Sequence, residues 1–257
     1  MLAYPPAYYD AYFVGVPGDV AFYTRRALST GGRVLELGAG TGRVLLPLAA
    51  AGVPVVGIEP DADLLALARQ RLSQASRGTR QQTCLLPGRM EELDLGETFA
   101  AVLIPYRTFQ HLLTPVDQVE ALSRIHAHLQ PDGLLLMDTF DPLQEMLRDG
   151  VQTPLRLDTD FLDPGSGQRV MVWYTRQVDL EMQLLEQHLV FEALDADGRS
   201  CARTHAQLVL RYTPQQEMIY LLENCGFCVE ELSGDFHDSL YPGYGNQVWV
   251  ARRSAEA

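Results

Sequence analysis

The chain has 257 residues, of which 47% are hydrophobic and 21% charged, and its formal net charge is −13. This length and composition are typical of a globular protein with one large domain, and they exclude a disordered chain. No run of about 18 apolar residues occurs, so we expect no membrane-spanning helix and no membrane partner. The first residues lack the basic and apolar segments of a secretory signal, so we expect a cytoplasmic protein.

The charge balance argues against a nucleic-acid partner. Contacts with phosphates need cations, whereas acidic residues outnumber basic residues here by 33 to 20. Every basic residue is Arg, which excludes mechanisms that depend on a Schiff-base or phosphate-binding Lys. Cys225 and Cys228 form a C-x-x-C pair, but no second pair accompanies it, so we expect buried thiols and no metal site.

Helices and strands are predicted to alternate through the first 140 residues. Asp19 is expected to cap the first helix. The alternation predicts an α/β fold in which helices cover both faces of a parallel sheet. In chain order, the expected elements are a helix at 19–28, a strand at 33–37, a helix at 43–51, a strand at 53–58, a helix at 61–76, strands at 83–86 and 99–104, a helix at 116–129 and a strand at 134–139.

The pattern changes after residue 150, where four β segments follow one another at 155–162, 169–178, 183–194 and 201–212. The alternation of apolar residues at 170, 172 and 174 predicts antiparallel strands with one covered face. Thr213 and Glu217 resemble a capping box with Pro214 at the first helical position. That helix should reach residue 224, and strands should follow at 227–232 and 247–251. We therefore predict a single domain over residues 1–257 with an antiparallel β insertion at residues 150–212.

The strongest chemical signal is the sequence VLELGAGTG at residues 34–42. Its glycines allow a sharp turn from strand to helix and a close approach of a ligand to the main chain. Arg43 stands where a dinucleotide-binding motif would have its third glycine. Glu36, two residues before the first glycine, suits a ligand with an ammonium group, and Glu59 at the end of the next strand can accept hydrogen bonds from ribose hydroxyls.

Five segments together resemble the class I S-adenosylmethionine (SAM)-dependent methyltransferases, and the resemblance covers nearly the whole chain. They are residues 34–43, 57–61, 87–90, 99–112 and 128–138. The Tyr-rich N-terminus and the antiparallel insertion are similar to the small-molecule branch that contains sugar-amine and glycine-type N-methyltransferases. The resemblance implies a doubly wound, seven-stranded, Rossmann-like α/β sheet with an antiparallel last strand, and the β insertion follows strand five.

The resemblance also implies which residues bind SAM. Relatives often have Asp just before the Met at position 90, whereas this chain has Arg89, which would stack on the adenine or leave its recognition to a backbone carbonyl. The implied cofactor-binding residues are Glu36, Gly38 and Gly40 at the methionine part, Glu59 and Pro60 at the ribose, Leu64, Arg89 and Met90 at the adenine, and Ile104 and Pro105 near the methyl group.

Candidates for chemistry and acceptor binding are fewer. His111 is a candidate general base with a near-neutral pKa, with a structural role as the alternative. Tyr9 is a second catalytic candidate, since its hydroxyl could reach the site from the N-terminal segment. Candidate substrate-binding residues are Tyr106, Trp173, Arg176 and Asp235, and the insertion is expected to be the acceptor-binding lid.

The sequence thus predicts an enzyme of the transferase class that methylates N or O of a small molecule. A monomer and a homodimer both stay open. One alternative is an NAD(P)-dependent oxidoreductase, which Arg43 and the absence of Lys disfavour. The other is a non-catalytic SAM-binding protein, because one fold serves many functions.

Overall fold

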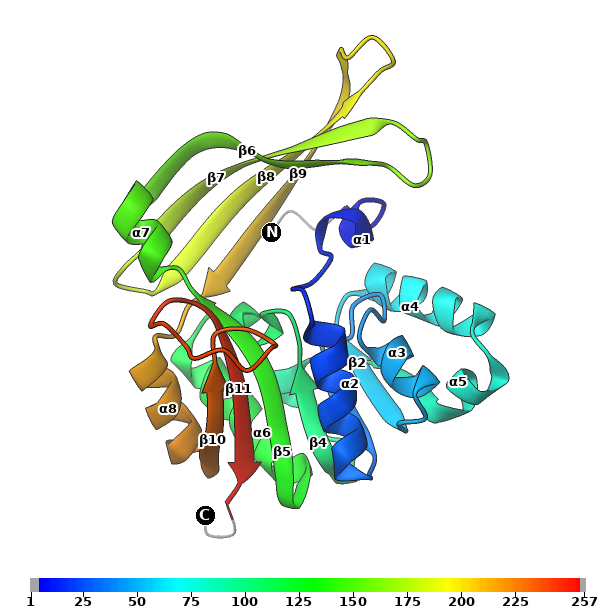
Figure 1. Cartoon of the computed structure of the whole chain (residues 1–257), viewed down its shortest axis with the longest axis vertical. Helices are drawn as coiled ribbons and strands as arrows, with labels where there is room; N and C mark the ends of the chain where they lie inside the picture. Colours follow the sequence, from blue (N-terminus) through cyan, green and yellow to red (C-terminus); the bar gives the residue numbers. More distant parts are fainter. Residues whose placement is uncertain (1–4, 255–257) are drawn as a thin grey trace. The chain divides into compact units, whose positions relative to one another are not determined.

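The computed structural model describes residues 5–254, whose internal contacts divide them into two compact units (Figure 1). The larger unit comprises residues 16–141 and 213–254, and the smaller unit comprises residues 5–15 and 142–212. Each unit is built on its own sheet, one of seven strands and one of four. Each sheet has its own core of buried side chains.

The larger unit contains a seven-stranded sheet in the order β10-β11-β5-β4-β1-β2-β3. Neighbouring strands from β1 to β5 pair in parallel, whereas β11 is antiparallel to both β5 and β10. This topology confirms the predicted doubly wound sheet with an antiparallel last strand. The strands are β1 (Val34–Leu37), β2 (Val55–Glu59), β3 (Thr83–Pro87), β4 (Phe99–Ile104), β5 (Leu129–Asp141), β10 (Phe227–Ser233) and β11 (Gly245–Arg253).

Helices cover both faces of this sheet. One face packs against α2 (Asp19–Thr30), α3 (Leu45–Ala50) and α4 (Ala62–Gln74), and the other against α6 (Pro115–His128) and α8 (Gln215–Asn224). Side chains alternate between faces along a strand. Leu35 and Leu37 of β1 belong to the α6 side, so Glu36 between them points to the side of α2.

The smaller unit is an antiparallel sheet of four consecutive strands. They are β6 (Gln152–Leu162), β7 (Arg169–Asp179), β8 (Leu184–Leu194) and β9 (Ser200–Arg211). One face buries Val170, Val172, Leu189 and Phe191, and Tyr8 stacks on Phe191 with a centroid distance of 5.5 Å. The predicted antiparallel sheet with one covered face is therefore confirmed. The short helices α1 (Tyr9–Tyr12) and α7 (Leu143–Asp149) complete this unit.

Two predicted helix caps are wrong. The N-cap of α2 is Gly18, at φ 89°, and Asp19 is the first helical residue. The N-cap of α8 is Pro214, so the expected capping box does not form, and the Thr213 hydroxyl accepts a hydrogen bond from Gln118 at 3.3 Å. The Thr213 side chain thus makes a contact elsewhere in the fold, and the Asp19 carboxylate accepts the Val20 amide of its own helix and also pairs with Arg43.

Short helices account for most of the elements that periodicity missed. The helix α5 (Arg77–Gln82) has few apolar residues, and the Ser76 side chain that caps it by accepting from the Thr79 amide at 3.1 Å gives only a local signal. The 3-10 turns η1 (Met90–Glu92) and η2 (Thr108–His111) follow β3 and β4. None of the described helices is long and apolar enough to span a membrane.

Candidate functional site

The loop after β1 turns on glycines at the carboxyl edge of the seven-stranded sheet. Gly38 and Gly40 have φ values of 71° and 55°, which glycine adopts without strain. A Cβ atom at Gly38 would lie 2.2 Å from Cγ2 of Thr108 in the loop after β4, so a larger residue does not fit. Gly38 is therefore required by the close packing of Thr108 against the main chain of this loop. Strand order reverses between β1 and β4, and doubly wound sheets bind their ligands at such a point.

Glu36 presents a buried carboxylate next to this loop. The residue is 2% exposed, and its Oε2 atom has no hydrogen-bond partner among residues 5–254. Burial raises the pKa of this carboxyl to about 8; the charge of Arg43 lowers it, and Glu59 and Asp19 raise it. A buried oxygen without a partner is costly, unless a ligand donates to it. Glu36 thus fits the ammonium group of a bound SAM.

Glu59 at the end of β2 holds the glycine loop as well as facing the site. Its Oε2 accepts from the Gly40 amide at 2.7 Å, and its Oε1 accepts from the Asp61 amide at 2.8 Å. Burial raises the pKa of this carboxyl, although both amides oppose the shift. Each carboxylate oxygen can accept a second hydrogen bond, so Glu59 fits a ribose diol. Its anchoring of Gly40 was not visible in the sequence.

The other residues predicted to bind the donor differ in exposure. Pro60 and Arg89 are exposed, and Arg89 Nε donates to Glu91 Oε1 at 2.5 Å. Stacking of Arg89 on the adenine therefore requires that it leave this ion pair, and it stays a prediction. The buried members of the predicted set are Leu64 at the start of α4, Met90 in η1, Ile104 at the end of β4, and Pro105.

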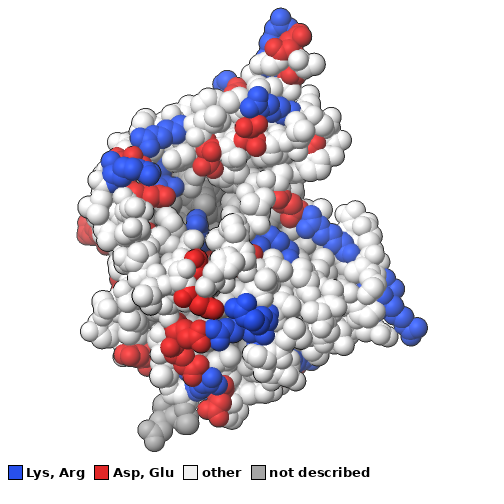
Figure 2. All heavy atoms as spheres, viewed as in Figure 1, with Lys and Arg blue, Asp and Glu red and all other residues white. Residues whose placement is uncertain are grey.

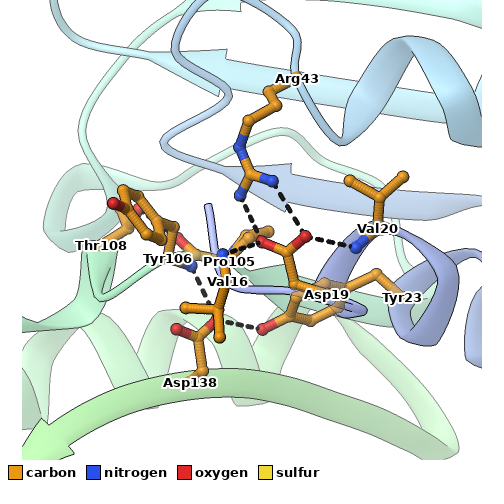
Figure 3. Close-up of polar contacts among 9 residues, drawn as sticks. All are labelled: Val16, Asp19, Val20, Tyr23, Arg43, Pro105, Tyr106, Thr108 and Asp138. Atoms are coloured by element: carbon orange, nitrogen blue, oxygen red, sulfur yellow. Dashed lines mark hydrogen bonds and ion pairs between the residues drawn. The ribbon is translucent and has the colours of Figure 1, made fainter. Parts of the chain in front are cut away.

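A bidentate ion pair joins α2 to the segment after the glycine loop (Figure 3). Arg43 Nη1 lies 3.0 Å from Asp19 Oδ1, and Nη2 lies 2.7 Å from Oδ2. Asp19 also accepts the amides of Val16 at 3.2 Å and Val20 at 2.6 Å. The guanidinium carbon of Arg43 lies 5.2 Å from the ring centre of Tyr106. In the sequence, Arg43 was recognisable only as a departure from a dinucleotide-binding motif, so its pairing with Asp19 was not predicted.

A second buried group fixes the loop after β4. Asp138, within β5 and 2% exposed, accepts the Tyr23 hydroxyl at 2.6 Å and the Tyr106 amide at 2.7 Å (Figure 3). Both hydrogen bonds end on the same oxygen, Oδ1. Burial raises the pKa of the Asp138 carboxyl, while the two hydrogen bonds oppose the shift. Tyr23 and Asp138 are 115 residues apart, so no local pattern announces the pair.

The backbone after β4 is strained where Asp138 holds it. Tyr106 and Arg107 have φ values of 55° and 64°. A left-handed conformation costs about 1–2 kcal/mol for a residue other than glycine, and it persists only where the surroundings impose it. Downstream, the Gln110 side chain donates to the Phe140 carbonyl at 3.0 Å and accepts its amide at 2.9 Å. The loop is thus tied to β5 at two points.

The two catalytic candidates lie in different units. His111 ends η2, and its side chain is exposed, although the protein atoms around the ring desolvate it and lower its pKa to about 4. The expected near-neutral pKa is therefore not found. Tyr9 lies on α1 of the smaller unit, where its ring packs against Phe13 with a centroid distance of 5.0 Å. A catalytic role for either residue stays a prediction.

The predicted acceptor-binding residues also divide between the units. Trp173 and Arg176 lie on β7 of the smaller unit, where Trp173 Nε1 donates to Glu192 at 3.0 Å and Arg176 forms an ion pair with Glu145. Tyr106 lies in the larger unit, after β4. Asp235 follows β10 and accepts two backbone amides of its own loop. Direct contact of these residues with an acceptor stays a prediction.

The cysteines differ from the expectation of buried thiols. All four are free, and Cys201 and Cys228 are exposed. Cys228 lies on β10, where alternation along the strand directs its side chain outward. Among residues 5–254, no group of three or more His, Cys, Asp or Glu side chains is arranged to hold a metal ion.

Known methyltransferases are similar to this chain in sequence and in fold. Residues 34–133 match the family described as a methyltransferase domain. The dTDP-3-amino-3,6-dideoxy-alpha-D-glucopyranose N,N-dimethyltransferase of Streptomyces fradiae is 33% identical over 120 residues, which are 47% of this chain and 44% of that protein. The structure of the CcbJ methyltransferase from Streptomyces caelestis is 25% identical, with a TM-score of 0.80 over 96% of this chain and 95% of that one. CalS10, an amino pentose methyltransferase from Micromonospora echinaspora, is 24% identical, with a TM-score of 0.72 and 99% of both chains covered.

The doubly wound sheet, the glycine loop and the matched family define the chain as a methyltransferase. More narrowly, the matched family, the relatives and the structural neighbours indicate a SAM-dependent methyltransferase.

Proposed function

We propose that this enzyme transfers the methyl group of SAM to the amine nitrogen of a small molecule, and that an amino sugar is the acceptor class. The observation that carries the proposal is the buried Glu36 carboxylate, whose free oxygen adjoins a glycine loop at the switch point of the sheet. The named relatives that methylate amino sugars support the acceptor class.

The chain's own residues would hold SAM by charge and shape. Glu36 would pair with its ammonium group, Glu59 would accept from its ribose hydroxyls, and the main chain of the glycine loop would border it. SAM supplies an electrophilic methyl group on a positively charged sulfur. The surrounding acids would stabilise that charge, and also the charge that appears on nitrogen as the new N–C bond forms.

The surface charge favours a small acceptor over a nucleic acid. On the face shown in Figure 2, arginines lie beside acidic side chains. Among the described residues, several arginines form ion pairs, such as Arg169 with Asp160 at 2.8 Å and Arg252 with Glu230 at 2.5 Å. Cations engaged in this way, in a chain of charge −13, offer little to a phosphate backbone.

An amine acceptor must lose its proton before its lone pair attacks the methyl group. The proton goes to solvent, because His111, with a pKa near 4, is neutral at pH 6–8 and too weak a base to hold it; the neutral ring would only accept a hydrogen bond from the amine. Its own titration falls below that range. A rate that rises through pH 6–8 would therefore report the acceptor amine, and the His111→Ala variant should keep the same inflection with a lower rate.

A binding and turnover screen tests the proposal. Calorimetry should show that SAM and S-adenosylhomocysteine bind and that NAD does not. Turnover with free and nucleotide-linked amino sugars, each beside its hydroxyl counterpart, should give methylated product only from the amines. The S-adenosylhomocysteine released should equal the product formed.

Other outcomes would favour other functions. SAM binding without turnover on any acceptor would indicate a non-catalytic SAM-binding protein, and NAD binding would revive the oxidoreductase alternative. Efficient methylation of tRNA or of a protein would exclude the small-molecule acceptor. Preference for the hydroxyl counterparts would change the acceptor atom from N to O.

A further inference from the structure

Four side chains converge on one residue of the loop after β4. Asp19 and Tyr23 lie one helical turn apart on α2, so they share a face of that helix. Asp19 reaches the ring of Tyr106 through Arg43, and Tyr23 reaches its backbone through Asp138 (Figure 3). The set that holds Tyr106, here named the Tyr106 clamp, consists of Asp19, Tyr23, Arg43 and Asp138.

We propose that the Tyr106 clamp is a positioning device that sets the Tyr106 side chain for methyl transfer, and that it acts on turnover more than on donor binding. The inference rests on the proposed function. It assigns a role to four residues that belong neither to the glycine loop nor to the pair of acids, Glu36 and Glu59, proposed to bind SAM.

One arm of the clamp fixes the ring. The guanidinium of Arg43 lies 5.2 Å from the centre of the Tyr106 ring, within the range of a cation–π contact. Arg43 cannot turn freely because Asp19 holds both of its terminal nitrogens. Asp19 is itself 4% exposed and bound to two amides at the start of α2. The ring position is therefore tied to the backbone of α2.

The other arm fixes the backbone. The Tyr106 amide donates to Asp138 Oδ1 at 2.7 Å, and the Tyr23 hydroxyl donates to the same oxygen at 2.6 Å. The Tyr23 hydroxyl orients the carboxylate, because Tyr23 is fully buried and cannot move away. The amide bond in turn holds Tyr106 at φ 55°.

Tyr106 is held both at its ring, by Arg43, and at its backbone amide, by Asp138. Stability of the loop alone does not require both contacts. Relaxation of Tyr106 to a negative φ would relieve strain and swing its ring away from Arg43. Strain that the surroundings impose on consecutive residues is a feature of sites that need a fixed geometry. Tyr106 follows β4 directly, next to the glycine loop at the switch point, where reacting groups of a bound donor and acceptor would meet. A small shift of a group there lowers the rate strongly.

The test compares variants that separate geometry from charge. Asp138→Ala removes the acceptor for both hydrogen bonds, whereas Asp138→Asn keeps an oxygen at the same position. Tyr23→Phe removes only the hydroxyl bond. We expect Asp138→Ala to lower kcat about 100-fold, Tyr23→Phe about 3- to 10-fold, and Asp138→Asn no more than about threefold, in keeping with the sensitivity of rates to small misplacements. The Kd for S-adenosylhomocysteine should stay within about threefold in all three.

Thr139→Ala is the matched control. Thr139 is the next residue on β5, is 1% exposed, and donates to Gln247 at 2.7 Å while accepting from Trp249 at 3.1 Å. Its removal breaks a buried hydrogen-bond network on the opposite face of the strand without touching Tyr106. Its Tm should therefore fall, as in Asp138→Ala, but its kcat should not fall with it.

Hydrogen exchange gives a readout that does not depend on activity. The Tyr106 amide should be protected in the wild type and should exchange faster in Asp138→Ala, but not in Thr139→Ala. Unchanged exchange would overturn the clamp. So would equal losses of kcat in Asp138→Asn and Asp138→Ala, or a Kd that weakens in step with kcat. If Asp138→Ala does not fold, the same test compares kcat and Tyr106 amide exchange in Tyr23→Phe with those in Thr139→Ala. If the wild type methylates no amine, the proposed function fails, while the exchange data still decide the clamp.

Discussion

Three buried carboxyl groups of the seven-stranded unit and two arginine-paired carboxyl groups of the four-stranded unit have pKa shifts of opposite direction. In the seven-stranded unit, burial raises the pKa of Glu36, Glu59 and Asp138. In the four-stranded unit, a hydrogen bond from Arg169 lowers the pKa of Asp160, and one from Arg203 lowers that of Glu192. The first set is buried without a bidentate arginine partner, whereas Asp160 is exposed and Glu192, although only 9% exposed, is paired with Arg203.

This difference separates a ligand site from a scaffold. An acid that pairs with an arginine on the next strand already has its charge balanced, so it has no need of a cationic ligand. An acid that is buried beside a glycine loop, with an oxygen left over, raises the energy of the ligand-free protein until a cation arrives. This contrast supports the proposal that the larger unit binds the cationic donor.

The largest expected effect comes from removal of the smaller unit. We expect a chain without residues 1–15 and with a Gly-Ser linker in place of residues 142–212 to bind S-adenosylhomocysteine and to lose turnover, by at least about 1000-fold, because orientation of the acceptor is lost. The residues predicted to bind the donor all belong to the larger unit. Calorimetry and a turnover assay check this. Loss of S-adenosylhomocysteine binding in a chain that still unfolds cooperatively would contradict it.

The next effect concerns Glu59. Glu59→Ala should weaken SAM binding by about 2–4 kcal/mol, because charge-assisted hydrogen bonds to the ribose are lost and because Gly40 loses the acceptor for its amide. Calorimetry at pH 8 measures the change. Glu97→Ala is the control, since its carboxylate pairs with the exposed Arg33, which precedes β1 and lies outside the predicted site. Wild-type affinity in Glu59→Ala would refute the placement of the ribose.

Much of the larger unit could be predicted from its sequence. The alternation of apolar strands with amphipathic helices gave the element order, and the expected strand at 99–104 matches β4 residue for residue. Glu36, Gly38 and Glu59 were recognisable because a strand, a glycine turn and the next strand lie within 26 residues. Local spacing carries the information there.

The Tyr106 clamp could not be predicted, because its members come from distant parts of the chain. Tyr23 meets Asp138 across 115 residues, and Tyr106 meets Asp138 across 32. Such pairs depend on strand order, which sequence periodicity does not report. Asp19 shows the same limit, since a local rule made it a helix cap while the fold gives its carboxylate to Arg43.

A pH dependence of donor binding should follow from Glu36. Its pKa of about 8 means that the carboxyl is mostly protonated below pH 8, and a protonated carboxyl cannot pair with an ammonium group. We expect the affinity for S-adenosylhomocysteine to fall about tenfold for each pH unit below 8 and to level off above it. Glu36→Gln should remove this slope and leave only the titration of the ligand itself. Equal slopes in both proteins would contradict the role of Glu36.

The same group has the opposite effect on the ligand-free protein. Because the pKa of Glu36 is higher in the folded state than in the unfolded state, the folded state binds more protons between pH 4.5 and about 8. Its contribution to stability therefore falls as the pH rises through this range. The Tm of the ligand-free wild type should decline relative to Glu36→Gln, and saturating ligand should reverse that order.

The smallest effect should come from the surface acids of the four-stranded unit. Asp160 accepts from Arg169 at 2.8 Å, but the two side chains are 42% and 57% exposed, so solvent screens the pair. The lowered pKa of Asp160 adds stability only above the unfolded pKa, and that part is lost as the pH falls through the folded value. At pH 7 we expect Asp160→Asn, Arg169→Gln and the double variant to share the wild-type Tm within error and to keep its turnover. A different result would show that the two side chains are coupled. In that case each single variant would have a clearly lower Tm, and the double variant would lose no more than either one. The ion pair would then contribute to the stability of the smaller unit.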